Sequence, residues 1–166
     1  MNCAEESIGR GTQWREVQAH LDSDVLLAVF DYWASLETRA DLPRWSAFDH
    51  TRINDVLPHV VLMGVRTTPL DFSFLIIGTD ILAHFATDYT GQWFSEISHR
   101  SDPSALYTNL SRAVIERRPI VSETPYVGPK KDYKLNKEVI LPMTDDEGLI
   151  NRLVVIIDFI WSQDDS

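Results

Sequence analysis

Apolar residues near the N-terminus recur every three or four positions, which is the spacing of one face of a helix. This pattern predicts a helix over residues 22–37, and Asp22 or Asp24 can cap its start by accepting hydrogen bonds from free backbone N–H groups. The apolar stripe of this helix consists of Leu26, Phe30, Trp33 and Leu36. A shorter stripe predicts another helix over residues 12–21.

Two strands joined by a tight turn follow this helical region. Asp49 can cap a short helix that Pro58 ends, because the residue before proline is pushed out of the α region. A valine-rich segment, 59–66, and a second segment, 72–77, then have strand character. The connection through Pro69 is short enough for an antiparallel hairpin.

Short helical pieces and one longer helix separate these strands from the C-terminal half. Thr79 or Asp80 can cap a short helix, and a second irregular piece surrounds Phe94. Asp102 and Pro103 together are a helix start, a capping carboxylate followed by proline at the first helical position. We expect the longer helix to run from there to Pro119.

The C-terminal half reads as three strands, 120–127, 133–143 and 150–160. Asp145 to Gly148 is a tight-turn signal between the last two of them. Apolar residues do not alternate with polar ones over 153–157, so both faces of the last strand require burial.

This element order predicts an α+β fold with a five-stranded antiparallel sheet. A helical crossover covers one face and the N-terminal helix covers the other. The stripe on that helix is also a candidate interface. It packs either on its own sheet or on the sheet of a partner chain, as in a homodimer, and the pattern leaves both alternatives open.

Length and charge limit the functional class. The chain of 166 residues fits one domain, which we place at 22–160, between an N-terminal tail or helix at 1–21 and a C-terminal tail at 161–166. A net charge of −10 disfavours nucleic acid and anionic membranes as partners. With one cysteine, Cys3, and no apolar run long enough to span a membrane, we expect a cytoplasmic protein.

Several short motifs, in order, are similar to those of a known family. The motifs are Asp31-Tyr32-Trp33, Leu57-Pro58-His59, Gly78-Thr79, Asp88 with Gly91, and Glu138 with Leu141 and Pro142. Over residues 24–160 the chain resembles the short bacterial PAS-like family. This resemblance implies a PAS fold and a sensory or regulatory module that binds a small molecule or relays contacts with another protein, without catalysing a reaction.

The resemblance places a ligand pocket between the crossover helices and the sheet. The candidate lining residues are Phe74, Ile76, Phe85, Phe94, Tyr107, Leu110 and Val114. His84, Tyr107 and Ser122 are the polar candidates to orient a ligand. A core filled by the same apolar side chains is an equally good interpretation of this set.

The cofactor remains unassigned. A covalent flavin adduct would need a cysteine in the crossover, and the crossover has none, whereas non-covalent flavin remains open. His84 or His99 could ligate haem, although a hydrogen-bonded histidine is the more ordinary role. The histidine spacing offers no metal site.

The chain carries no nucleophile-elbow, Walker or dinucleotide motif, so nucleotide-driven chemistry has no support. Two alternatives to sensing stay open. One is a ligand-free interaction or dimerisation domain. The other is an α+β enzyme or carrier of the nuclear transport factor 2-like type, which needs longer, curved strands.

All four lysines lie at 130–137, in either a docking patch or a solvated hairpin.

Overall fold

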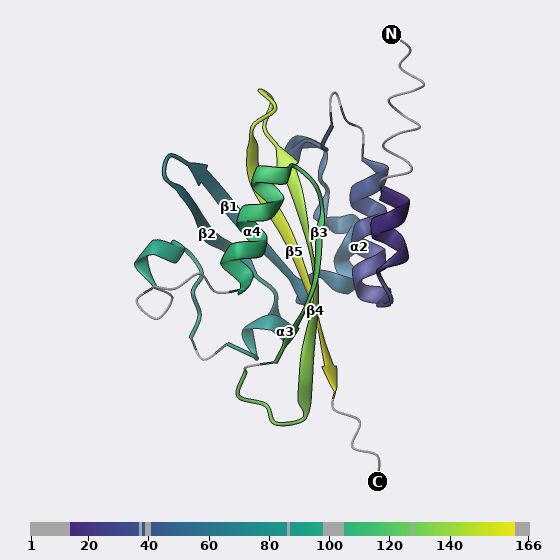
Figure 1. Ribbon diagram of the computed structural model, residues 1–166, viewed down its shortest axis with the longest axis vertical. Coiled ribbons are helices and arrows are strands. Elements are labelled where there is room, and N and C mark those ends of the chain that lie inside the picture. The colour runs from purple at the N-terminus through teal and green to yellow at the C-terminus, as the bar shows by residue number, and fades with distance from the viewer. Residues whose placement is uncertain are drawn as a thin grey trace.

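The computed structural model describes residues 14–36, 38, 41–85, 87–97, 105–126 and 128–161. Residues 14–19 are helical. The helices that follow are α2 (Asp24–Ser35), the 3₁₀ helices η1 (Trp45–Ala47) and η2 (His50–His59), α3 (Thr79–Leu82), the 3₁₀ helix η3 (Phe94–Glu96), and α4 (Ala105–Glu116). The strands are β1 (Val60–Thr67), β2 (Leu70–Ile77), β3 (Ile120–Pro125), β4 (Tyr133–Thr144) and β5 (Ile150–Trp161). Figure 1 shows these elements along the chain.

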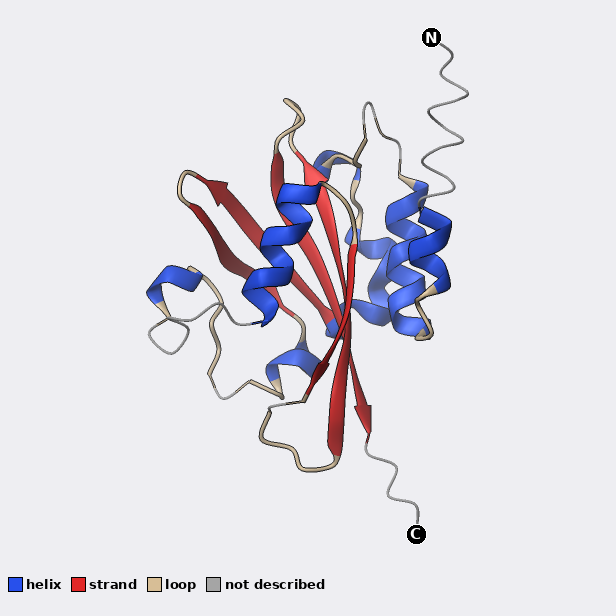
Figure 2. Ribbon diagram, viewed as in Figure 1, coloured by secondary structure: helices blue, strands red, loops and turns tan. Residues whose placement is uncertain are grey.

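The five strands form one antiparallel sheet, as predicted, and the structure gives their order as β2-β1-β5-β4-β3. Their bounds agree with the sequence analysis to within two residues at each described end. The predicted turn between β4 and β5 is present, and Gly148 adopts the positive φ of 84° that favours glycine there. The sheet lies between two helical layers (Figure 2).

Helices α3 and α4 lie on one face of the sheet and α2 lies on the other, and we call these the α4 face and the α2 face (Figure 1). The indole Nε1 of Trp33 donates to the backbone oxygen of Pro142 at 3.0 Å. Leu26, Phe30 and Trp33 are fully buried, and Leu36 is half-buried. The stripe therefore packs on the sheet of its own chain, which is the first of the two predicted alternatives. The side chains of Leu26, Phe30 and Trp33 do not reach the surface.

The central strand β5 is buried from both sides. Each residue from Leu153 to Ile157 is buried. The neighbours of β5 in the sheet are β1 and β4, and helix α2 packs on β5 and β4 from one side. The absence of alternation in this segment correctly predicted that both faces would be covered.

Two helix caps differ from those expected. Ser23 caps α2 by accepting from the backbone N–H of Leu26, and Asp22 instead pairs with Lys137. Gly78, rather than Thr79 or Asp80, precedes α3, and it offers no side-chain cap. Asp49 does cap η2 through Thr51 N–H.

A β-bulge in β2 moves one predicted pocket residue to the wrong face. Met63 pairs with Phe74, but Leu62 pairs with Ile76, which leaves Leu75 as the extra residue. The insertion reverses the alternation, because side chains change faces at every position of a strand. Ile76 therefore lies on the α2 face with Leu62, 60% exposed, and the expectation that it points inward with Phe74 is wrong.

Replacing Ile76 with serine is expected to change the free energy of unfolding by less than about 0.5 kcal/mol, since the side chain is mostly solvated. Phe74→Leu, two positions away and buried, is expected to cost about 1–2 kcal/mol. Urea denaturation of both variants measures the contrast. Equal losses would show that Ile76 is an interior residue after all.

Some sequence expectations fall outside the described residues. These are the predicted helix start at Asp102 and Pro103, His99 as a haem ligand, the helix end at Glu37, the strand end at Val127, and most of the two tails. None of the described helices is long and apolar enough to cross a membrane.

Candidate functional site

Aromatic rings fill the α4 face at the β2 side of the sheet. Phe74 of β2 stacks on Phe94 of η3, with ring centroids 5.3 Å apart and planes at 20°. Phe85 meets Phe74 edge-on at 6.3 Å, and Tyr107 of α4 meets Phe72 edge-on at 5.5 Å. Such offset and edge-to-face pairs are the favourable arrangements of aromatic rings. Four predicted pocket residues are thus brought together as a packed cluster.

Helix α4 covers the sheet beside this cluster. Leu110 is fully buried, whereas Val114 is half-buried. The hydroxyl of Tyr107 donates to the backbone oxygen of Leu70 at 3.3 Å. This bond fixes α4 to the start of β2, and the role of Tyr107 toward a ligand stays a prediction.

A buried carboxylate lies beneath α4, on the same face. Glu138 of β4 is 5% exposed, and it is flanked by Ser122 of β3 and Ile157 of β5. Ser122 Oγ donates to Glu138 Oε1 at 2.6 Å, and the Asn109 side chain of α4 forms a second hydrogen bond. Burial raises the pKa of Glu138, although these two hydrogen bonds act in the opposite direction.

This carboxylate is the feature of the α4 face that apolar periodicity could not reveal. Glu138 entered the sequence analysis only as part of a motif, while Ser122 entered as a polar candidate. A carboxyl group with a raised pKa can accept or donate a hydrogen bond, depending on pH. The Asn109–Ser122–Glu138 group therefore offers a polar anchor within an apolar interior.

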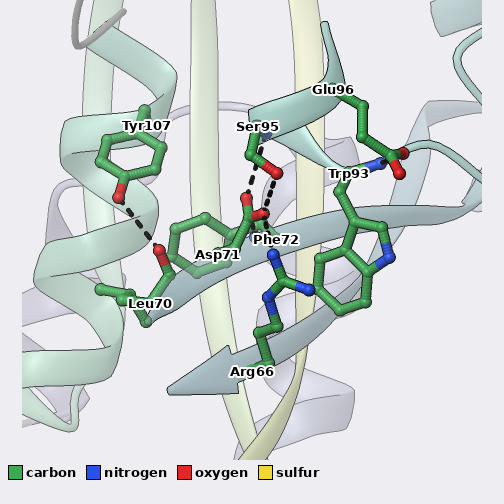
Figure 3. Close-up of polar contacts among 8 residues, drawn as sticks. All are labelled: Arg66, Leu70, Asp71, Phe72, Trp93, Ser95, Glu96 and Tyr107. Carbon is green, nitrogen blue, oxygen red and sulfur yellow. Dashed lines mark hydrogen bonds and ion pairs between the residues drawn. The ribbon is translucent and has the colours of Figure 1, made fainter. Parts of the chain in front are cut away.

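A hydrogen-bond network at the edge of β2 holds η3 against the sheet (Figure 3). The carboxylate of Asp71 is 3% exposed and accepts from Ser95 Oγ at 2.5 Å and from Arg66 Nη2 at 2.9 Å. It also accepts from the backbone N–H groups of Phe72 and Ser95. The guanidinium of Arg66 lies 4.4 Å above the centre of the Trp93 ring, a cation–π contact.

The segment before η3 pairs with the same edge. Phe74 N–H donates to Gln92 O at 3.0 Å, and Gly91 N–H donates to Phe74 O at 2.7 Å. Gly91 has a φ of 85°, which explains glycine at the end of the Asp88 turn. Together with Asp71, this pairing positions Phe94 over Phe74, so the network determines the shape of the aromatic cluster.

His84 lies in a different aromatic group from the one expected. Its ring stacks on Phe159 of β5 at 3.7 Å, and its Nδ1 lies 2.7 Å from the hydroxyl of Tyr126. Burial lowers the pKa of His84, and the charge of Lys130 adds to this effect. These contacts place the His84 ring beside Phe159 and Tyr126, and its role in orienting a ligand stays a prediction.

A large cleft opens on the α2 face, where no pocket was predicted. It has a volume of about 520 Å³ and lies between η1–η2 and strands β1 and β2. Trp45, Phe48, Leu62 and Ile76 are among the side chains that line it. Sequence signals for this cleft were weak, because its walls come from an irregular segment and from the part of β2 that follows the bulge.

The four lysines do not form one free patch. Lys137 lies on β4 and pairs with Asp22 and, at 3.8 Å, with Glu123. Lys130 lies in the β3–β4 connection and lines a second cavity near His84. Within the described ranges, the histidines and carboxylates form no group of three that could hold a metal ion.

Comparison with known proteins gives one family and several similar structures. A family model described as a PAS domain matches residues 21–157. None of the curated proteins matches the chain. A sensory box sensor histidine kinase from Vibrio cholerae is similar, with 14% identity, a TM-score of 0.48, and coverage of 69% of this chain and 93% of that chain. A light-oxygen-voltage domain studied with a flavin analogue has 16% identity, a TM-score of 0.45, and coverage of 70% and 88%.

Proposed function

Because the chain belongs to the PAS domain family, we propose that it is a non-enzymatic sensory and regulatory module that binds a small molecule on the α4 face of its sheet. The ligand would lie beneath α4, with Glu138 as its polar anchor. The conformational change caused by ligand binding would be passed to another protein by direct contact. The single cysteine of the sequence supports a site of action in the reducing cytoplasm.

The observation that carries this proposal is the buried Glu138 carboxyl. Burial of an ionisable group is unfavourable for folding unless hydrogen bonds compensate, so its presence in an apolar layer points to a role beyond packing. Ser122 and Asn109 hold the carboxyl from two elements, β3 and α4. A ligand that bonds to Glu138 would therefore shift α4 relative to the sheet.

A ligand-free interaction domain is the second candidate function. The packing of Phe72, Phe74 and Phe94 favours it, because all three rings are buried and Phe94 contacts the other two. In that case the α4 face is an ordinary core. Protein contacts alone would then carry the regulatory signal.

Native mass spectrometry and an absorption spectrum of the full chain separate the two candidates. We expect an additional non-covalent mass that is lost on denaturation. The mass should be retained in Glu123→Leu, which alters an exposed carboxylate on the neighbouring strand, and lost in Glu138→Leu. A chain that carries only its own mass and its aromatic absorption would contradict ligand binding and favour the interaction domain.

Glu138→Gln is expected to make stability less dependent on pH. Because burial raises the folded-state pKa of Glu138, its contribution is fully present below the ordinary glutamate pKa of 4.5 and is lost as the pH rises through the folded value. The glutamine variant should therefore gain stability relative to wild type across that window and keep the gain at neutral pH. Urea denaturation at several pH values measures this, and a difference independent of pH would contradict it.

A further inference from the structure

We propose that a second cavity, beside α3 at the far end of β5, binds a small organic ammonium ion. The cavity has a volume of about 330 Å³. Its walls come from the end of η2, from α3, from the β3–β4 connection and from the end of β5. None of Asn109, Ser122 and Glu138 lines it, so the proposal is independent of the ligand proposed above.

Aromatic rings form one wall of this cavity. His84 stacks on Phe159, and Tyr133 meets the His84 ring edge-on at 4.8 Å. Tyr133 also packs on Trp161 with ring centroids 4.5 Å apart. Trp161 is 59% exposed, so a ligand can reach its ring. The faces of such rings attract cations through their quadrupoles.

The charges around the cavity also favour a cation. The lining residues carry two carboxylates, Asp80 and Asp158, and one ammonium, that of Lys130, while the charge of Lys137 on β4 also acts on Asp158. Ser23 Oγ donates to Asp158 at 2.7 Å, which fixes that carboxylate, while Asp80 lies 3.3 Å from His59 Nε2. His59 Nδ1 is buried without a hydrogen-bond partner among the described residues, so this wall contains an unsatisfied hydrogen-bonding atom.

The volume limits the ligand to a small molecule. Small-molecule sites span roughly 300–1,000 Å³, and this cavity is at the lower end of that range. It therefore suits a compact amine rather than a haem or a dinucleotide. Carboxylates beside exposed aromatic faces are the combination that recognises alkylated ammonium groups.

The test is titration of the full chain with choline chloride, followed by calorimetry and tryptophan fluorescence. The control ligand is 3,3-dimethyl-1-butanol, which has the shape of choline without its charge. We expect choline to bind with a dissociation constant in the millimolar range, and the neutral alcohol to bind about tenfold more weakly or worse. Trp161→Phe should keep most of the affinity and remove most of the fluorescence change.

Three further variants identify the site. Trp161→Ala should weaken choline binding about fivefold or more, because it removes the most exposed ring. Lys130→Met should strengthen binding about threefold, since it removes a positive charge from the wall. Lys131→Met, next to it but outside the lining, should leave the affinity unchanged.

Three results would overturn the proposal. These are equal binding of the neutral alcohol, absence of choline binding by both methods, and weaker choline binding in Lys130→Met, which is incompatible with an ammonium ion bound beside Lys130. Circular dichroism checks that Trp161→Ala is folded. If it is not, the two lysine variants still decide the sign of the charge that the cavity prefers.

Discussion

Replacing Trp33 with alanine is expected to lower the free energy of unfolding by about 3–5 kcal/mol, the range for deleting a large buried aromatic side chain. The indole is fully buried and contacts the rings of Trp14 and Phe30, at 4.9 and 5.9 Å. The substitution would leave a cavity between α2 and the sheet. It would also remove the hydrogen bond that the Trp33 indole donates to Pro142 O. Urea denaturation with a spectroscopic probe measures the loss.

Trp33→Phe is the matched control. It keeps most of the apolar area but loses the Nε1 hydrogen bond, so we expect a smaller loss of about 1–2 kcal/mol. A changed oligomeric mass with unchanged stability in Trp33→Ala would contradict burial within the chain. That result would instead identify the stripe on α2 as a seam between two copies.

Asp71→Ala is expected to destabilise the fold by about 3–5 kcal/mol, because it removes a buried carboxylate together with its four hydrogen bonds. The carboxylate accepts from the side chains of Arg66 and Ser95 and from two backbone N–H groups. Without it, η3 loses its attachment to the start of β2, and Phe94 loses its fixed position over Phe74. Hydrogen exchange of the amides near η3, together with urea denaturation, measures both effects.

Arg66→Ala tests whether the ion pair or the buried acceptor matters more. The Arg66 side chain is 45% exposed, so solvent screens its charge and we expect a loss below about 1 kcal/mol. Ser95→Ala should have an intermediate effect of about 1–2 kcal/mol, since it removes one hydrogen bond. Equal losses in Arg66→Ala and Asp71→Ala would show that the ion pair, not the network, holds η3.

Regular elements of this fold were predictable because their signals are local. Strand ends follow from turn residues such as Gly148, and burial of β5 follows from a run of apolar residues. The bulge at Leu75 carries no such signal, because it depends on how β2 pairs with β1. This single extra residue is why Phe74 was placed correctly and Ile76 was not.

The candidate sites were less predictable than the fold, because they depend on partners far apart in the sequence. Asp71 looks like an ordinary turn residue, and only Ser95, 24 positions later, makes it a buried acceptor. The contacts that hold the His84 ring come from Tyr126 and Phe159, 42 and 75 positions later, and no local pattern around His84 indicates either of them. Sequence spacing indicates the face of an element, but not which neighbouring element supplies the contact.

The position of β5 has a consequence for the order in which the protein is made. β5 is the last of the five strands to leave the ribosome, yet it lies in the middle of the sheet, between β1 and β4. The hairpin of β1 and β2 and the pair of β3 and β4 cannot join until it arrives. Helix α2 is synthesised early, but Trp33 cannot form its hydrogen bond until Pro142, 109 residues further along the chain, has been made. A nascent chain should therefore expose the apolar face of α2 until β5 has been made, and chaperone contacts should be concentrated there.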